Sequence, residues 1–495
     1  MRSRKQIQKN KGLNRREFVG SGARTVAALA VAPGFVCGGF AAGLLNPAPG
    51  DWTRYGHDIH NTRFNSHETT IGRSNVDRLK VKWQFDIDVP IETTPTVVGD
   101  TVYFVAPGAY YALDSRTGQL KWKYEMPEEA SGNVRRGVDY YEGRIFGGDS
   151  TGWVRCLDAA TGEQLWARDV SAPEPGESAV RISGACLAFN DKVYVGTTGY
   201  KNRVLCLNAG NGTTCWEYWV TGENDFGKGG SIWTSPALDE KEGVLYIVTG
   251  SNKFPGGHDP VLFTESLLAF DADTGYLRWF YQAQPNDPHD LDWSAHPVIF
   301  DAEAPPMKRG SIRQAVVAAN KTGFFCFDRY TGELFWRAQL TQRYHYGGPN
   351  VDEIAVAYNK VYVVSNAATQ LIGKPPLSVT AALDGYTGRI VWWTYNPQGI
   401  IQGAIAVANR VMYQGFNNGR MEALDADTGK VLWEHTLPTA RRGGFAISNG
   451  ALYCSNGLPG GLRGGGGPGI NPPDLAERHR NAGAYSVYCF TVNGR

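Results

Sequence analysis

The stretch "FCFDRYTGELFW", residues Phe325–Trp336, decides the fold because the chain contains seven versions of it. In six of them a strand ends at an aspartate whose side chain can cap a turn, and in the copy at 205–216 Asn208 takes its place. A glycine then supplies the positive φ that closes a short hairpin, and a second strand carries the tryptophan. The other versions are "YALDSRTGQLKW" (111–122), "RCLDAATGEQLW" (155–166), "LCLNAGNGTTCW" (205–216), "LAFDADTGYLRW" (268–279), "AALDGYTGRIVW" (381–392) and "EALDADTGKVLW" (422–433).

An alternating apolar run such as "DKVYVGT" or "NKVYVVS" precedes the hairpins, so each unit holds about four strands. Units of this kind are the blades of a propeller. Trp83, in "LKVKWQFDI", has no such hairpin before it, and the strands after Trp433 have no tryptophan partner. An eighth blade built from both chain ends would use both pieces and leave no open sheet edge. The sequence therefore predicts an all-β, eight-bladed β-propeller closed by its N- and C-terminal strands, rather than a seven-bladed one.

The repeated tryptophans and most cysteines have a structural interpretation. A tryptophan at one fixed position per blade buries roughly 150–250 Å² and would join neighbouring sheets. Four cysteines (Cys156, Cys206, Cys326 and Cys489) take the place that alanine takes in other blades, which indicates small buried side chains. The chain has no CxxC or CxxCH motif, so the cysteines indicate neither a metal site nor an attached haem.

The N-terminal residues differ from the rest. "NRREFVG" (14–20) places paired arginines before a mildly apolar run, which is typical of a twin-arginine export signal. We expect a signal segment over residues 1–45, a single propeller domain over 46–495, and a periplasmic protein that is not an integral membrane protein. The alternatives are a basic tail with a weak membrane anchor, or lipid attachment at Cys37. The formal net charge of +1 gives no footprint for nucleic acid.

Several segments outside the repeat resemble pyrroloquinoline quinone (PQQ) dependent alcohol dehydrogenases, in the order found in that family. They are "DWTRYGHDIHNTRFN", "IETTPTVVGDTVYFV", "NVRRGVDYYEGRIF", "GGSIWTSPALDEKEGVLYIVTGSN", "NDPHDLDWSAHPV" and "AANKTGFFCFDRYTGELFW". The length and "DLDWSAHP" look closest to the polyvinyl alcohol dehydrogenase branch. PQQ is a flat quinone with three carboxylates, so its site needs an aromatic plane, cations and polar groups around its edge.

The resemblance implies a set of cofactor-binding residues. Trp233 comes on a different strand from the repeat tryptophans and matches the residue that stacks on the quinone. Lys321 precedes its hairpin and matches the basic residue that bonds the quinone oxygens; a lysine is costly to bury without a partner. The resemblance adds an arginine for a PQQ carboxylate and three polar contacts, namely Arg136, Glu92, Ser183 and Asn350.

The resemblance also implies a catalytic base and a metal. Asp292 matches the base, with Asp290 close by, and Asn252 with Asp292 would be metal ligands. Calcium is expected rather than a lanthanide, because Ser294 stands where lanthanide-using relatives carry aspartate. The pattern is incomplete, since Lys201 falls near the place of a metal-ligating glutamate and Ser251 faces the ligating asparagine. Calcium wants six or more oxygens, so the site is rebuilt, Lys201 replaces the cation, or activity is lost.

These features together predict an exported quinoprotein dehydrogenase that oxidises a small or polymeric alcohol with PQQ. Without a haem motif in the chain, the electrons would pass to a separate acceptor such as a cytochrome c. The alternative is a non-catalytic propeller that keeps the scaffold and binds a partner protein. A third interpretation keeps PQQ and changes the substrate to an aldehyde or a sugar.

Overall fold

The computed structural model describes residues 47–127, 136–171, 180–199, 201–222, 229–251, 260–287, 291–305, 310–340, 353–367, 377–396, 401, 403–438, 443–457 and 485–495. By its internal contacts the chain divides into the units Met1–Gly43 and Leu44–Arg495, and only the second is described below. The predicted signal segment lies outside the described residues. In the part of the chain that is described, no helix is long and apolar enough to cross a lipid bilayer.

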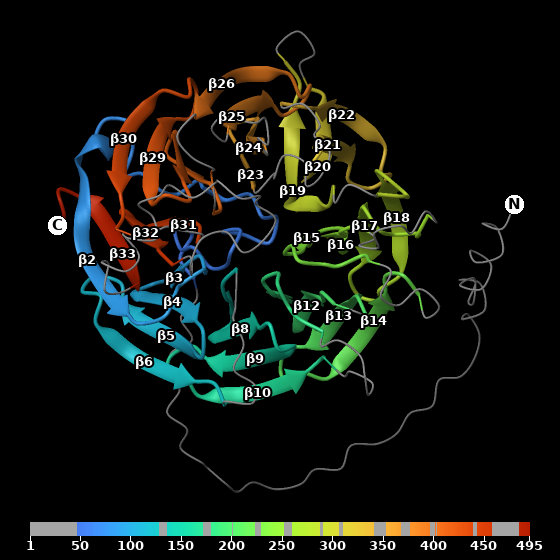
Figure 1. The fold of residues 1–495 in the computed structure, drawn as a ribbon, viewed down its shortest axis with the longest axis horizontal. Coiled ribbons are helices and arrows are strands. Elements are labelled where there is room, and N and C mark those ends of the chain that lie inside the picture. The colour runs from blue at the N-terminus through green and yellow to red at the C-terminus, as the bar shows by residue number, and fades with distance from the viewer. Residues whose placement is uncertain are drawn as a thin grey trace, which may run out of the picture. The chain divides into compact units, whose positions relative to one another are not determined.

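The described strands form eight sheets arranged as blades around one axis (Figure 1). Blades 1 to 4 run outward as β3 (Thr96–Val98), β4 (Thr101–Ala106), β5 (Ala109–Asp114) and β6 (Leu120–Glu125); β7 (Asp139–Tyr141), β8 (Arg144–Gly148), β9 (Trp153–Asp158) and β10 (Gln164–Asp169); β11 (Leu187–Phe189), β12 (Lys192–Gly196), β13 (Arg203–Asn208) and β14 (Thr214–Trp219); and β15 (Ala237–Asp239), β16 (Val244–Val248), β17 (Ser266–Asp271) and β18 (Leu277–Gln282).

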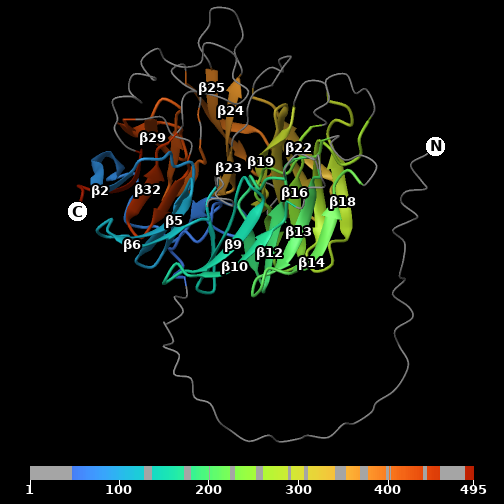
Figure 2. The same cartoon turned by 60° about the horizontal axis from the view of Figure 1, so that its bottom comes forward.

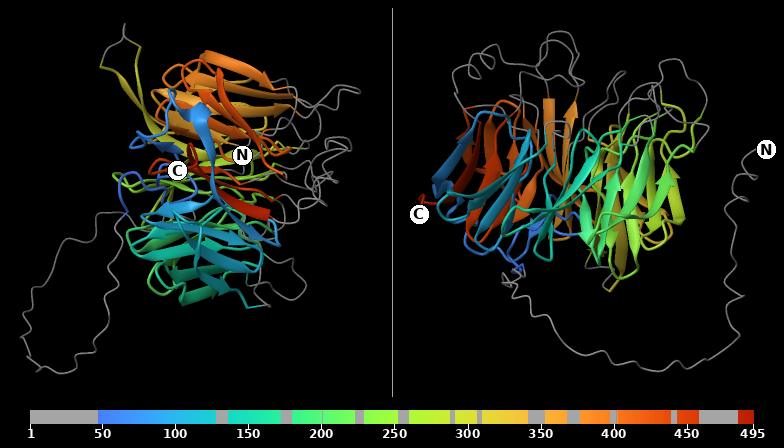
Figure 3. Two further views of the ribbon diagram at one scale, coloured as in Figure 1. Left: turned by 90° about the vertical axis from the view of Figure 1, so that its left-hand side faces the viewer. Right: turned by 90° about the horizontal axis from the view of Figure 1, so that it is seen from below.

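Blades 5 to 8 continue the ring. They are β19 (Trp293–Glu303), β20 (Ile312–Asn320), β21 (Gly323–Asp328) and β22 (Leu334–Ala338); β23 (Ile354–Ala357), β24 (Lys360–Ala367), β25 (Leu377–Asp384) and β26 (Ile390–Asn396); β27 (Ala406–Ala408), β28 (Val411–Gly415), β29 (Arg420–Asp425) and β30 (Val431–Thr436); and β31 (Phe445–Ser448), β32 (Ala451–Ser455), β33 (Tyr485–Val492) and β2 (Leu79–Ile87). A short 3-10 helix, η1 (Val76–Arg78), precedes β2. In the tilted and edge-on views, each blade is a twisted stack of antiparallel strands (Figures 2 and 3).

The eighth blade joins the two ends of the propeller, as the sequence predicts. Its order is β31-β32-β33-β2, so that an N-terminal strand forms the outer edge of a C-terminal sheet. Trp83 of β2 lies opposite Cys489 of β33 in the register. The predicted eight-bladed fold and its closure by both termini are therefore confirmed.

Six of the seven repeat tryptophans, and Trp83, dock on the hairpin of the following blade, which explains why glycine and tryptophan recur together in the pattern. In the first blade, the Trp122 indole N–H donates to the carbonyl of Ala159 at 3.0 Å. Gly162 of that hairpin has φ +76°, and a Cβ there would lie 2.6 Å from the Trp122 ring. The glycine is thus needed both for the turn and for the tryptophan stacked on it. The same pairing recurs at Trp83 with Gly118, Trp166 with Gly212, Trp216 with Gly275, Trp279 with Gly332, Trp336 with Gly388, and Trp392 with Gly429.

A small residue lies opposite the tryptophan in every blade. Cys156, Cys206, Cys326 and Cys489 take this position in four blades, facing Trp166, Trp216, Trp336 and Trp83. Alanine takes it in the others. All four cysteines are buried and free, which agrees with their interpretation as small core side chains.

A short N-terminal stretch, residues 51–65, lines the inner side of the ring; we call it the axial segment. Its last two residues form β1 (Phe64–Asn65), which pairs in parallel with β27. The segment passes the inner strands in blade order and hydrogen-bonds to each. The hydrogen-bonded pairs are Trp52 with Val97, Thr53 with Tyr140, Arg54 with Ala188, Ile59 with Leu238, His60 with Ile299, Thr62 with Val356, Arg63 with Val407 and Asn65 with Ile447.

Candidate functional site

Most predicted site residues hold the same position in successive blades, a few residues before the inner strand. Glu92 precedes β3, Arg136 precedes β7, and Ser183 precedes β11. Trp233 precedes β15, and Asp292 comes directly before β19. Because the blades are arranged around one axis, equivalent positions lie at one end of the ring. The segments are therefore brought together although they span 200 residues of sequence.

The backbones of the segments that precede the inner strands of neighbouring blades lie in close contact. The Thr94 N–H donates to the carbonyl of Arg136 at 3.0 Å, which joins the first two blades. A Cβ on Gly137, at φ +139°, would lie 2.8 Å from the carbonyl oxygen of Thr94. A Cβ on Gly184 would lie 2.2 Å from the carbonyl oxygen of Thr234, beside Trp233. Glycine at 137 and 184 thus permits the packing that positions Arg136 and Trp233.

Trp233 differs from the repeat tryptophans in its surroundings. It is half-buried, and the Arg136 guanidinium lies 6.0 Å from its ring centroid. This distance is at the limit of a cation–π contact. The pair offers an aromatic surface next to a cation, which is the combination that a flat, anionic ligand requires.

Asp292 and Lys321 form a buried ion pair in blade 5. Their exposed fractions are 5% and 6%, and Lys321 Nζ lies 3.1 Å from Asp292 Oδ2. The backbone N–H of Ser251 donates to Oδ1 at 2.7 Å. A Cβ on Gly250 would lie 2.7 Å from Asp292 Oδ1 and 3.4 Å from Trp233 Nε1. The structure therefore brings Asp292 and Trp233 together at Gly250, with Lys321 paired to the other oxygen of Asp292.

Of the remaining five predicted residues, two lie in the described part of the chain and three do not. Glu92 is buried, in the segment that also holds Thr94, and Ser183 is half-buried next to Gly184. Asp290, Asn252 and Asn350 lie outside the described residues. The roles of these five residues stay predictions.

The described residues do not fit a calcium site. Both oxygens of Asp292 already contact other groups, one the Ser251 N–H and the other the Lys321 ammonium. Within the described ranges, no three His, Cys, Asp or Glu side chains gather as a metal ion would need. Calcium takes six to eight oxygen ligands. We therefore derive no chemical step through a metal.

The structure adds a buried polar cluster that the sequence did not predict, which we call the axial network: Tyr55, Arg63, Arg136, His296 and Glu353. The Tyr55 hydroxyl donates to Glu353 Oε1. Arg136 Nη1 donates to the same oxygen at 3.2 Å and to the Tyr55 hydroxyl at 3.1 Å. Arg63 Nη2 lies 2.7 Å from Glu353 Oε2, and His296 Nε2 lies 3.5 Å from Oε1. Glu353 comes directly before β23, in the position that Asp292 takes in blade 5.

The charges of the axial network follow from its geometry. Burial raises the pKa of Glu353, but Arg63, His296 and Arg136 together lower it to about 2. Burial lowers the pKa of His296 to about 4, although Glu353 opposes the change. The Ser235 N–H donates to His296 Nδ1, so the neutral ring carries its proton on Nε2, toward Glu353. At neutral pH the network thus holds two guanidiniums, one carboxylate and a net charge of +1.

The low pKa of His296 predicts a loss of stability in mild acid. The unfolded chain binds a proton as the pH falls below 6.5, whereas the folded protein does so only near pH 4. Stability therefore falls between these values, by about 3 kcal/mol. Urea denaturation from pH 7 to 4 should show this fall, and His296→Asn should flatten it. His67→Asn, at an exposed position, is the control; an equal pH dependence in wild type and His296→Asn would contradict the prediction.

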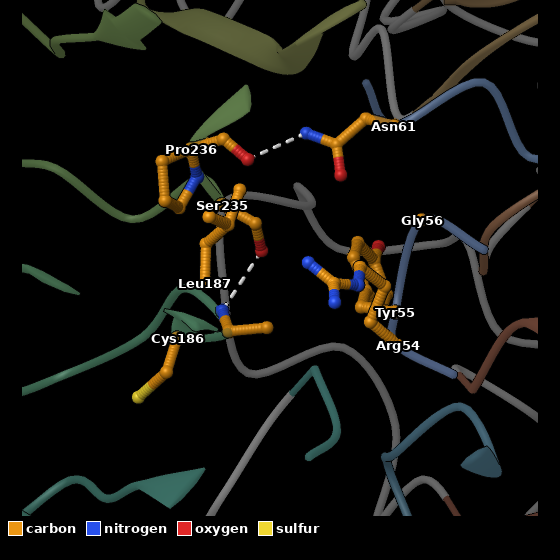
Figure 4. Close-up of a pocket in the computed structure, with 9 residues that line it drawn as sticks. Arg54, Tyr55, Gly56, Asn61, Cys186, Leu187, Ser235 and Pro236 are labelled. Carbon is orange, nitrogen blue, oxygen red and sulfur yellow. Dashed lines mark hydrogen bonds between the residues drawn. The ribbon is translucent and has the colours of Figure 1, made fainter. Parts of the chain in front are cut away.

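A small cavity lies between the axial segment and blades 3 and 4 (Figure 4). Its lining comprises Arg54, Tyr55, Gly56, Asn61, Ala185, Cys186, Leu187, Ser235 and Pro236. Asn61 Nδ2 donates to the Pro236 carbonyl at 2.8 Å, and the Ala185 N–H donates to Ser235 Oγ at 2.8 Å. The space suits about one water molecule and not a cofactor.

Two family models match parts of the chain. The model for the glucose, ethanol and alcohol dehydrogenase β-propeller domain matches residues 218–342, which include Trp233, Asp292 and Lys321. The model for the outer membrane protein assembly factor BamB matches residues 75–224. Over residues 218–342 the chain is therefore similar to the β-propeller domain of these dehydrogenases.

Individual relatives cover more of the chain. A quinohemoprotein alcohol dehydrogenase, ADH-IIG of Pseudomonas putida, is 26% identical over 78% of this chain and 69% of its own length. A polyvinylalcohol dehydrogenase of Pseudomonas sp. is 26% identical over 90% of this chain and 78% of its own length. The solved structure of ADHIIG from Pseudomonas putida HK5 covers 90% of this chain and 81% of its own, with a TM-score of 0.75 and 22% identity.

These findings confirm the predicted resemblance to PQQ-dependent alcohol dehydrogenases, with polyvinyl alcohol dehydrogenases among the relatives. They also confirm the predicted enzyme class, since these relatives are oxidoreductases that act on alcohols. The structural similarity, at 22% identity, supports the propeller fold alone.

Proposed function

We propose that this protein oxidises an alcohol or polyol with bound PQQ and passes the electrons to a separate acceptor. The observation that carries the proposal is that Trp233 and Asp292 meet at Gly250 while Lys321 pairs with Asp292. Two of these side chains are buried charges, and the third is an aromatic ring that is only half-buried. Such a constellation at the end of a rigid ring is typical of a site and not of core packing.

The described residues fit a flat, carboxylated quinone. Trp233 would provide the stacking surface, and Arg136, beside it, would pair with a carboxylate. Lys321 would bond to the quinone oxygens, and Glu92 and Ser183 would supply polar contacts. Asn350, outside the described residues, is proposed as a further contact. When bound, PQQ is the two-electron oxidant of the reaction.

The role that we propose for Asp292 is that of general base. Its carboxylate would accept the hydroxyl proton of the alcohol as the C–H bond breaks. The Ser251 N–H and the Lys321 ammonium hold its two oxygens at 2.7 and 3.1 Å, which fixes the direction in which the carboxylate faces. Asp290 is a second acidic candidate from the same loop. The substrate oxygen would therefore have to approach Asp292 next to Trp233.

The cellular setting is part of the same proposal. Residues 1–45 are proposed as a twin-arginine signal and residues 46–495 as one propeller domain, which would place the protein in the periplasm. A small-molecule or polymeric alcohol would be the substrate. A cytochrome c or a similar carrier would accept the electrons. Whether PQQ binding requires Ca²⁺ is tested in the titration below.

A second candidate function has its own support. The match of residues 75–224 to the BamB model favours a propeller that serves as a scaffold for a protein partner. BamB is an assembly factor, and the solved structure from Moraxella catarrhalis has a TM-score of 0.56 over 83% of this chain. Trp233, which is half-buried beside the Arg136 guanidinium instead of docked on a hairpin as the repeat tryptophans are, argues against this alternative.

Titration of the apo protein with PQQ, with and without Ca²⁺, tests the proposal. We expect saturable binding, followed by quinone absorbance and quenching of tryptophan fluorescence, and alcohol-dependent reduction of an artificial acceptor. Trp233→Ala removes a stacking surface worth about 1–3 kcal/mol per flat ring, so its Kd should rise about 10-fold or more. Lys321→Met should weaken binding similarly.

The control for this titration is Trp393→Ala, on the outer strand β26, where the side chain is 62% exposed. This variant should bind PQQ as the wild type does. Failure of the wild type to bind PQQ under any metal condition would overturn the proposed function and favour the scaffold. Binding that survives both site substitutions unchanged would place the cofactor elsewhere.

A further inference from the structure

We propose that Glu353 is a positioning residue: held by the axial network, it orients the guanidinium of Arg136 toward a carboxylate of the cofactor. This inference rests on the proposed function, because it assigns a further residue to the same site. Glu353 was not among the residues predicted from the sequence, and it touches the site only through Arg136.

The first argument is the direction in which Arg136 is held. Its two contacts with Glu353 and Tyr55 are both made by Nη1, so that one corner of the planar guanidinium is fixed. The side chain of Arg136 is 23% exposed, whereas that of Glu353 is 2% exposed. The guanidinium of Arg136 therefore joins the buried network to the half-buried Trp233, whose ring centroid lies 6.0 Å away.

The second argument is the rigidity of Glu353 itself. Three side chains hold its carboxylate, and they come from the axial segment and from β19: Tyr55, Arg63 and His296. The Arg63 guanidinium also stacks on the Tyr55 ring, with Cζ 4.1 Å from the centroid. A carboxylate fixed from several sides can hold an arginine in one orientation, which a water-exposed carboxylate cannot.

The third argument is charge. Arg63 and Arg136 carry two positive charges against the one negative charge of Glu353, and both His296 and Tyr55 are neutral at pH 7. The five residues of the network thus carry a net charge of +1, which favours an anionic group next to Arg136.

Whether Glu353→Gln strengthens or weakens PQQ binding distinguishes a role in orienting Arg136 from a purely electrostatic effect of the carboxylate. If Glu353 were only a nearby negative charge, Glu353→Gln would strengthen the binding of an anion such as PQQ. If it orients Arg136, the same change should weaken binding by about 10- to 100-fold, as expected for lost hydrogen bonds to a charged group. Because Glu353→Gln leaves Arg63 unpaired and buried, two further variants accompany it.

The double variant Arg63→Gln/Glu353→Gln keeps the net charge of the network at +1 and removes both buried ions together. Tyr55→Phe keeps every charge and the aromatic ring, and removes only the hydroxyl that contacts Glu353 and Arg136. We expect weaker PQQ binding in both, by about 10-fold or more in the double variant and about 3- to 10-fold in Tyr55→Phe. Circular dichroism and thermal unfolding would check that each variant folds.

The decisive readout compares PQQ with its trimethyl ester, which lacks the carboxylate charges. The ratio of the two Kd values in the wild type measures carboxylate recognition, and Arg136→Gln gives its value without the arginine. We expect the ratio in the double variant and in Tyr55→Phe to fall toward that of Arg136→Gln. A general loosening of the site would weaken both ligands equally and leave the ratio unchanged, which would overturn the inference. Wild-type protein that binds no PQQ would overturn the proposed function as well.

Discussion

Asp292→Asn is expected to lower kcat by about 10²- to 10⁴-fold while the Kd for PQQ changes only a few-fold. The amide has nearly the shape of the carboxylate and can still accept the hydrogen bond from the Ser251 N–H, so the loop should keep its position. It cannot accept the proton of an alcohol, however, and positioned proton transfer contributes about that factor. Steady-state kinetics with an artificial electron acceptor, together with PQQ titration, measure the two quantities separately.

Asp301→Asn is the matched control for this prediction. Asp301 lies on the same strand, β19, but its side chain is 55% exposed and pairs with Arg329 on the outside. This variant should keep kcat within about two-fold, as is usual for surface substitutions of small energetic effect. Asp292→Asn with undiminished kcat would rule out Asp292 as the base and direct attention to Asp290.

The second large effect concerns stability. Trp83→Ala should reduce the free energy of unfolding by about 3–5 kcal/mol, the range for removal of a large buried aromatic side chain. Trp83 is 8% exposed, its indole N–H donates to the Ser115 carbonyl at 2.9 Å, and its ring covers Gly118 of the first blade. It therefore joins the blade built from both chain ends to its neighbour, and urea denaturation followed by far-UV circular dichroism measures the loss.

Trp393→Ala serves again as the comparison. Trp393 neighbours the repeat tryptophan Trp392 in sequence, yet its side chain points outward from β26 and is 62% exposed. Its removal should change the free energy of unfolding by no more than about 0.5 kcal/mol. Equal losses in the two variants would mean that docking at Trp83 is not what closes the ring.

The fold could be predicted from the sequence because each repeat specifies both a local hairpin and the packing of one blade on the next. The aspartate and glycine specify a hairpin, and the tryptophan that follows docks on the hairpin of the next blade. Even Cys489, far from any complete repeat, could be matched to Trp83 because the small residue always lies opposite the ring. The axial segment was beyond such prediction, since β1 is only two residues long and its partners share no pattern with it.

The site was predictable only where a residue departs from the repeat. Trp233 and Lys321 were visible because the pattern left them without a structural role. Glu353 was missed because its partners Tyr55 and Arg136 are 298 and 217 residues away, and single buried pairs at such separations leave no periodic signal. The signals available were weak: Tyr55 and His296 stand in segments outside the repeat, and Glu353 is an acid directly before an apolar strand.

The path of the axial segment has a consequence for how the protein folds. Its residues leave the ribosome before any blade, but its last partner, on β31, is Ile447, whose carbonyl accepts a hydrogen bond from Asn65 across 382 positions. Contacts at such separations slow folding, because loop closure must come before they form. The blades can form one after another from local hairpins, whereas the axial segment can complete its bonds only when all eight inner strands stand in place. Docking of the axial segment is therefore expected to be the last step of folding, and Tyr55 and Arg63 would reach Glu353 only at that moment.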